Sequence, residues 1–170
     1  MRTFRAGLAS QAGHDLTIEA SRWSGDLTVS DDGQLADLDV RVDMGALIVR
    51  DGSGGLKPLT DRDKREIAVS ARKVLAADRN PEARFAAARV GPAEPGNGMI
   101  SGSFTLAGVT RPLQLRVSQT EPGKYRATTS VKQTDYGIKP YSGFLGALKV
   151  RDAVDVEIEI DLAAAAEAPS

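Results

Sequence analysis

The sequence predicts an all-β fold of antiparallel strands with one α-helix. Apolar and polar residues alternate with period two along most of the chain, which is the pattern of strands with one buried face. Short turn signals, such as SDDGQ, EPGNG and TEPGK, separate several of these segments, and tight turns favour antiparallel neighbours. One stretch, residues 60–77, has helical spacing instead.

The predicted strands each carry apolar residues of a single parity. In chain order they are HDLTIEASRW, GDLTVS, LDVRVDM, PLQLRVS, KYRATTSV and VDVEIEIDL. The last of them, residues 154–162, is the most regular, because five apolar residues alternate with four acids without interruption. Side chains of opposite parity point to opposite faces of a strand, so one face of each strand is expected to be dry.

The predicted helix, TDRDKREIAVSARKVLAA, runs from Thr60 to Ala77. Its apolar residues recur at helical spacing, at Ile67, Ala71, Val74 and Leu75. Thr60 can cap the N-terminus, and Asp63 occupies the position from which a capping-box acid reaches back. Pro81 disfavours helical geometry at Asn80, so the helix is expected to end before that residue.

Seven to nine short strands with one apolar face each must close on themselves, either as a sandwich or as a barrel. A barrel removes both exposed sheet edges. With about eight strands, its interior either fills with side chains or holds one small ligand. The inward candidates are mostly small and aliphatic, and aromatic residues make up 5% of the chain. This composition favours a cavity, although periodicity by itself is compatible with a packed core.

The composition excludes several classes of protein. A length of 170 residues suggests one domain, expected over residues 1–162 with a disordered tail at 163–170. The net charge is -1 with both signs interspersed, so no nucleic-acid partner is expected. No apolar run approaches a signal peptide or the ~20 residues of a membrane span. We therefore expect a soluble, cytoplasmic protein without an integral membrane segment.

No catalytic residue, metal site or cofactor is predicted. His14 is the only histidine, and on a strand Asp15 points to the opposite side, so His14 is expected to have a structural role or to end a loop. The acids within residues 154–162 are ~7 Å apart on one strand, which is too sparse to enclose calcium. Asp61 and Asp63 do not face one another on a helix, and capping explains them better than catalysis.

Two glycine-containing segments depart from the alternation. DGSGGLKP, residues 51–58, is expected to form a flexible loop, with DGSGG as a hinge or turn rather than a phosphate loop. YGIKPYSGFLGALK, residues 136–149, carries six large apolar residues without a simple period. Such an apolar loop must cover something. The options are a flap over a barrel mouth, a homodimer contact, or a plug packed inside.

Several motifs resemble the YceI-like family. GSFTLAGVTRPLQLRV, residues 102–117, is similar to that family's G-x-L-T-[IL]-x-G-V-T-x-P-[VL]-x-[LF] signature. TDYGI at 134–138 and NPEARF at 80–85 are similar to its D-F-G-I and y-P-x-I-x-F elements, and the resemblance covers 14–162 in consistent order. It implies a closed antiparallel lipocalin-like β-barrel of about eight strands with one α-helix. Some members of that family bind a polyisoprenoid chain inside the barrel.

The function expected from these observations is non-catalytic binding or sequestration of an amphiphilic lipid, an isoprenoid by resemblance, inside the barrel. The lining expected from parity is Ile18, Val40, Val42, Phe85, Phe104, Leu115, Val131 and Ile158, with Tyr136 and Phe144 at the mouth. Two alternatives stay open. One is an enzyme acting on a lipid or isoprenoid substrate, and the other is a ligand-free interaction protein with a filled barrel.

Overall fold

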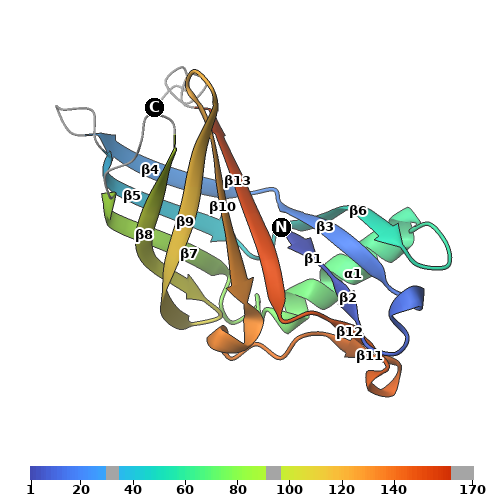
Figure 1. The fold of residues 1–170 in the computed structure, drawn as a ribbon. Helices are drawn as coiled ribbons and strands as arrows, with labels where there is room; N and C mark the ends of the chain where they lie inside the picture. Colours follow the sequence, from blue (N-terminus) through green and yellow to red (C-terminus); the bar gives the residue numbers. More distant parts are fainter. Residues whose placement is uncertain (30–34, 91–96, 162–170) are drawn as a thin grey trace.

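A large antiparallel sheet with one helix dominates the computed structural model (Figure 1). The structure describes residues 1–29, 35–90 and 97–161, without the side chains at 29, 35, 36, 88–90 and 144. The predicted disordered tail at 163–170 therefore lies outside the described residues. The ten strands of the large sheet are β1 (Arg2–Thr3), β3 (His14–Ala20), β4 (Trp23–Val29), β5 (Leu35–Asp43), β6 (Leu47–Gly54), β7 (Glu82–Val90), β8 (Asn97–Leu106), β9 (Val109–Glu121), β10 (Lys124–Lys132) and β13 (Ala153–Asp161).

A second, three-stranded sheet and several short helices complete the fold. The small sheet consists of β2 (Arg5–Ala6), β11 (Ser142–Gly143) and β12 (Leu148–Val150). The helix is α1 (Asp61–Val74), and the 3-10 turns are η1 (Ser10–Ala12), η2 (Gln133–Tyr136) and η3 (Phe144–Gly146). The all-β prediction with one α-helix is thus confirmed.

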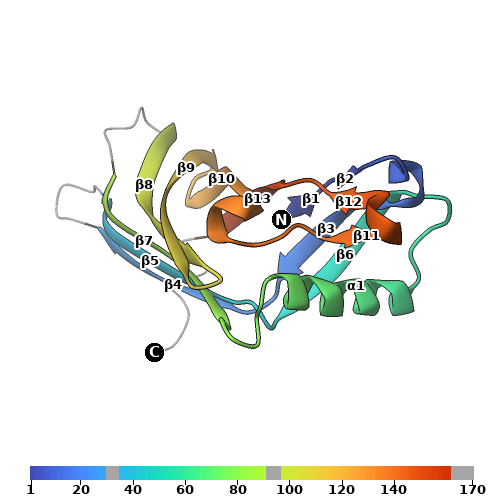
Figure 2. The same ribbon diagram turned by 90° about the horizontal axis from the view of Figure 1, so that it is seen from below.

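The large sheet curls into a half-barrel that stays open (Figure 2). Its strand order is β4-β5-β7-β8-β9-β10-β13-β1-β3-β6, and the end strands β4 and β6 do not pair with each other. The predicted closed barrel of about eight strands is therefore wrong in its closure and in its strand number. The end strands stay apart because β4 pairs with β5 and β6 with β3, as two parts of one long hairpin joined by backbone hydrogen bonds at residues 21–22 and 43–46. Strand β1, between β13 and β3, is two residues long and meets β13 at a single register pair, Arg2 opposite Asp155. So short a strand cannot carry the ladder along the rest of β13.

The alternation predicted in the last strand is confirmed. β10 and β13 pair over nine consecutive positions, from Lys124 opposite Asp161 to Lys132 opposite Ala153. Val154 is buried and Ile158 is partly buried, whereas the acids between them are exposed. The apolar side of the strand is only half covered towards its end, because the half-barrel is open there.

The core is divided into two clusters of buried apolar side chains. The first lies among β3, β6, α1 and the neighbouring strands and comprises Ile18, Met44, Leu47, Val49, Ala68, Ala77, Ala83, Leu106, Val131, Tyr136 and Ile138. The second lies on β5 and β7–β10 and comprises Leu38, Val40, Phe85, Ala87, Ile100, Leu115 and Ala127. Val42, Phe104 and Leu113 pack against both clusters and join them.

Helix α1 begins with the predicted capping box. The Asp63 backbone N–H donates to Thr60 Oγ1 at 3.2 Å, and the Thr60 N–H donates to Asp63 Oδ2 at 2.8 Å. The Thr60 hydroxyl also donates to Asp63 Oδ2 at 2.6 Å, and this bond, followed by the one from the Thr60 N–H, lowers the pKa of the Asp63 carboxyl. The helix ends at Val74 rather than at the predicted Ala77, because Ala76 adopts a left-handed conformation with φ of 51°.

The expected loop at 51–58 is instead partly a strand, since β6 continues to Gly54 and pairs with β3. The glycines reflect close packing rather than a hinge. A Cβ at Gly52 would collide with the Leu59 side chain, and one at Gly54 would collide with the Arg5 guanidinium. Glycine within a strand often marks such an approach by a neighbouring group.

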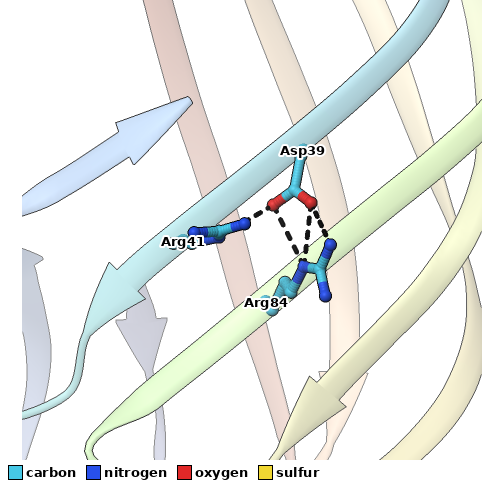
Figure 3. A network of polar contacts seen from close by, with 3 residues as sticks. All are labelled: Asp39, Arg41 and Arg84. Carbon is cyan, nitrogen blue, oxygen red and sulfur yellow. Dashed lines mark hydrogen bonds and ion pairs between the residues drawn. The ribbon is translucent and has the colours of Figure 1, made fainter. Parts of the chain in front are cut away.

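An ion-pair network fixes the outer face of the half-barrel where β5 and β7 lie side by side (Figure 3). Arg84 Nε donates to Asp39 Oδ2 at 2.9 Å and to Oδ1 at 3.1 Å, and Arg84 Nη2 also contacts Oδ2. Arg41 Nε adds a hydrogen bond to Oδ1 at 3.3 Å. The hydrogen bonds from Arg84, followed by the charges of Arg84 and Arg41, hold the pKa of Asp39 below its usual value.

The two faces of β13 should differ in their tolerance of polar substitution. We expect Ile158→Asp to lower the free energy of unfolding by at least about 2 kcal/mol, because it places a carboxylate beside the second apolar cluster. The matched change Glu157→Ser, on the exposed face, should have little effect. Urea unfolding of the two variants measures both values, and equal losses would contradict the assignment of the faces.

The capping box predicts a specific loss on substitution. Thr60→Ala removes the side-chain oxygen that accepts from the Asp63 N–H, so unfolding should become easier by about 0.5–2 kcal/mol. Thr60→Ser keeps the hydroxyl and serves as the control that should retain most of the stability. An unchanged urea midpoint for Thr60→Ala would show that the cap does not contribute to the stability.

The Asp39 network should make stability depend on acid. Because the folded-state pKa of Asp39 is lowered, its ionised form stabilises the fold above the unfolded pKa of about 3.9, and this contribution is lost as the pH falls through the folded pKa. Asp39→Asn should therefore be less stable than the wild type at neutral pH, and the difference should shrink below about pH 4. Thermal melts between neutral and acidic pH test this, and a difference that does not change with pH would refute it.

Candidate functional site

A large hollow occupies the space within the half-barrel. Its volume is about 1860 Å³, and it is open to solvent. The inner faces of β3, β5 and β13 line it, together with one face of α1 and side chains of the small sheet. Its lining also includes Arg116, Thr128 and Glu157, whose parity places them on the opposite side of the sheet. The volume therefore includes a surface groove as well as the interior.

Parity alone identified residues that the fold brings together. Seven of the expected lining residues contact the hollow: Ile18, Val40, Val42, Phe85, Phe104, Val131 and Ile158. Leu115 instead borders a separate void of about 40 Å³. Phe85, Phe104, Val131 and Ile158 line both spaces, so the void lies next to the hollow.

The two residues expected at the mouth behave differently. Tyr136 is buried in the first core cluster, where its ring meets Phe104 edge to face with centroids 5.5 Å apart. It supports the wall of the hollow rather than standing at an entrance, and burial raises the pKa of its hydroxyl. The side chain of Phe144 lies outside the described part of the structure.

The segment 136–149 is more ordered than its sequence suggests. Tyr136 ends η2, and the following chain forms β11, η3 and β12 before it reaches β13. β12 pairs with β2, so this segment and the N-terminal strand β2 build the small sheet beside the hollow. Tyr141, Leu148 and Lys149 contribute to the lining. The segment therefore borders one end of the hollow. Of the three expected arrangements, this position is most similar to the flap.

The sequence analysis missed the contribution of the helix to the lining. Ile67, Ala71 and Val74 on α1 face the hollow, opposite the sheet. These residues have helical spacing, and the apolar face of a helix must pack against other apolar groups. It could have been assigned to the lining on that basis. The loop residues Leu56 and Leu59 gave no comparable periodic signal.

Two arginines of the lining are paired with carboxylates. Arg50 donates to Glu19 through Nε at 2.6 Å and Nη2 at 2.9 Å, which lowers the pKa of the Glu19 carboxyl. Arg5 lies beside Asp15, whose Oδ1 accepts from the Arg5 backbone N–H at 2.8 Å.

Two polar side chains lie within the lining. Gln133 is buried, and its Nε2 donates to the carbonyl oxygens of Arg151 at 2.9 Å and Asp152 at 3.3 Å. Among the described residues, the Thr3 hydroxyl is the one buried side-chain polar atom without a hydrogen-bond partner. A few polar groups of this kind in an apolar site can orient the head of a ligand.

The geometry around His14 is structural. Its Nε2 lies 2.8 Å from the carbonyl oxygen of Lys57, and its ring packs against Gly55. Within the described ranges, no group of three or more His, Cys, Asp or Glu side chains is arranged to hold a metal ion. In those ranges there is also no helix with the length and apolarity needed to cross a membrane.

Comparisons with known proteins agree on one family. The YceI-like domain profile matches residues 5–162. Among solved structures, the YceI protein of Campylobacter jejuni is similar with a TM-score of 0.61, 15% sequence identity, and coverage of 85% of this chain and 82% of that chain. BcnA of Burkholderia cenocepacia is similar with a TM-score of 0.63, 12% identity, and coverage of 84% of each chain. No curated protein matches the chain.

Proposed function

Since the chain belongs to the YceI-like family, we propose that its half-barrel binds one long-chain amphiphilic lipid, such as an isoprenoid, without transforming it. The apolar chain lies along the inner face of the sheet and against α1. The head lies where Gln133 and Thr3 offer polar atoms within the lining. The proposed lining comprises the seven residues predicted from parity that contact the hollow, with Leu115 behind them.

The size of the hollow carries this proposal. Pockets for drug-sized ligands measure roughly 300–1,000 Å³, whereas this hollow measures about 1860 Å³. The surface groove accounts for part of this volume, and the interior accounts for the rest. An extended apolar chain suits a hollow of this size whose walls include many apolar side chains.

The driving force would be the removal of apolar ligand surface from water. Each square ångström buried contributes about 25 cal/mol before the cost of ordering the ligand. Because the sheet and helix are already in place around the hollow, little protein rearrangement is needed to bind the guest. The protein would thus act by sequestration, keeping an insoluble chain dispersed in water.

A ligand-free interaction protein is the second candidate, and one observation favours it. The void beside Leu115 has a volume of only about 40 Å³, so the space among Phe85, Phe104 and Ile158 is nearly filled by side chains. If the same side chains also close the large hollow in solution, no guest would enter. The two candidates therefore differ in whether added bulk displaces a ligand or strains a core.

A pair of matched substitutions separates these candidates. Val131→Trp adds bulk to a buried lining position, whereas Val69→Trp adds the same bulk to an exposed position on α1. With a hollow barrel, we expect Val131→Trp to abolish binding of a fluorescent isoprenoid analogue while the protein remains folded. Val69→Trp should bind normally.

A filled barrel would give a different result in the same assay. Overpacking a filled core typically costs 1–3 kcal/mol, so Val131→Trp would melt early and the wild type would bind no analogue. That combination would refute the lipid-binding proposal. Mass spectrometry of an organic extract of the purified wild type supplies an independent check for bound lipid.

A further inference from the structure

Three leucines project almost entirely into solvent at one end of the molecule. Leu8 and Leu145 are fully exposed and Leu56 is 81% exposed. Among the described residues, the next most exposed large apolar side chain, Trp23, is only 50% exposed. We call Leu8, Leu56 and Leu145 the leucine tips. Exposed apolar groups that gather in one region usually mark an interaction surface.

The three loops that carry the leucine tips lie together. Both ribbon views place the turn before η1, the β6–α1 loop and the β11–β12 connection at the end of the molecule with the small sheet (Figures 1 and 2). The Ala9 N–H donates to the Ala147 carbonyl oxygen at 2.8 Å, which ties the Leu8 turn to the Leu145 turn. His14 Nε2 lies 2.8 Å from the Lys57 carbonyl oxygen and holds the loop of Leu56.

The backbone keeps these side chains directed outward. Leu145 has φ of 54° and ψ of 31°, a left-handed conformation that leucine rarely adopts. Gly7, before Leu8, has φ of 91°, and a Cβ there would collide with the Ala147 carbonyl oxygen. The tips are therefore presented by turns that are hydrogen-bonded and tightly packed, and the surrounding structure must hold Leu145 in its unusual conformation.

The segments that carry the tips are basic where they are charged. The three segments that carry them, residues 6–13, 52–59 and 140–149, contain no Asp or Glu. Two of them contain lysines, Lys57 and Lys149, and neither ammonium group pairs with a carboxylate in the described structure. Exposed leucines beside unpaired lysines suit a surface whose outer layer is anionic and whose interior is apolar.

We propose that this end of the protein docks on a lipid bilayer bearing anionic headgroups, with the leucine tips inserted between them. A fully exposed side chain protrudes from the surface around it, so a rigid protein partner would have poor shape complementarity to it. A lipid surface can accommodate separate protrusions, and lysines beside them attract anionic lipids. The hollow reaches the same end, where Leu56, Lys57 and Lys149 belong to its lining.

Docking would place the hollow against the source of its guest. An amphiphile could then move between the bilayer and the half-barrel with less of its chain exposed to water. This transfer rests on the proposed function, whereas docking itself does not. The two can therefore be tested separately.

Vesicle co-sedimentation tests the docking. The wild type should sediment with vesicles made of equal parts phosphatidylcholine and phosphatidylglycerol. The double variant Leu8→Ser/Leu145→Ser should bind these vesicles with an affinity lower by roughly ten-fold or more. The matched control Ile48→Ser/Val69→Ser removes two exposed apolar side chains elsewhere and should bind like the wild type. Lys57→Glu/Lys149→Glu should also weaken binding, and added salt should reduce the binding of the wild type.

Three results would overturn the proposal. They are a wild type that does not sediment with these vesicles, equal losses in the tip and control variants, and a wild-type dimer by size exclusion that the tip variant loses. The last would assign the tips to a second copy of the chain. Thermal melts confirm that each variant is folded. The isoprenoid analogue assay on the tip variant separates docking from ligand binding. A tip variant that still binds the analogue but no longer binds vesicles shows that the tips serve docking and not the hollow.

Discussion

The structure depends on covering the apolar faces of ten strands with a chain that has few large side chains. Phenylalanine occurs four times, and of these Phe85 and Phe104 pack inside while Phe4 lies beneath the Arg151 guanidinium, 5.8 Å away. Curling the sheet and laying α1 across it covers much of these apolar faces. It does not supply enough side-chain volume to fill the space enclosed. The hollow is thus a consequence of composition as much as of topology.

Local signals predicted the parts of the fold that depend on neighbours in sequence. Alternation identified the buried parity of β13 and most of the residues that meet in the hollow, although it could not say which strands adjoin. Thr60 and Asp63 marked the start of α1 because a capping box lies within four consecutive residues. The resemblance of the 102–117 segment supplied the fold family, which the periodicity alone left open between barrel and sandwich.

Contacts between distant residues explain what the sequence analysis missed. DGSGG has the composition of a loop, but in the structure Leu59 packs against Gly52 and Arg5 against Gly54. No sequence pattern near residue 51 indicates these contacts. Tyr136 lies in an apolar segment that suggested an entrance, yet Phe104 from β8 draws it into the core. The open barrel has the same cause, since no local period reveals which strands adjoin and which remain at the edges.

The two-residue strand β1 also has a consequence for how the protein is made. It brings Arg2 opposite Asp155, so the two halves of the sheet join through residues from opposite ends of the chain. Pairings of such high contact order form slowly and only once both partners have been synthesised. The hairpin of β4 and β5 and the meander from β7 to β10 can assemble earlier from local pairings. The enclosure around the hollow would then be completed last, with its apolar walls exposed until that step.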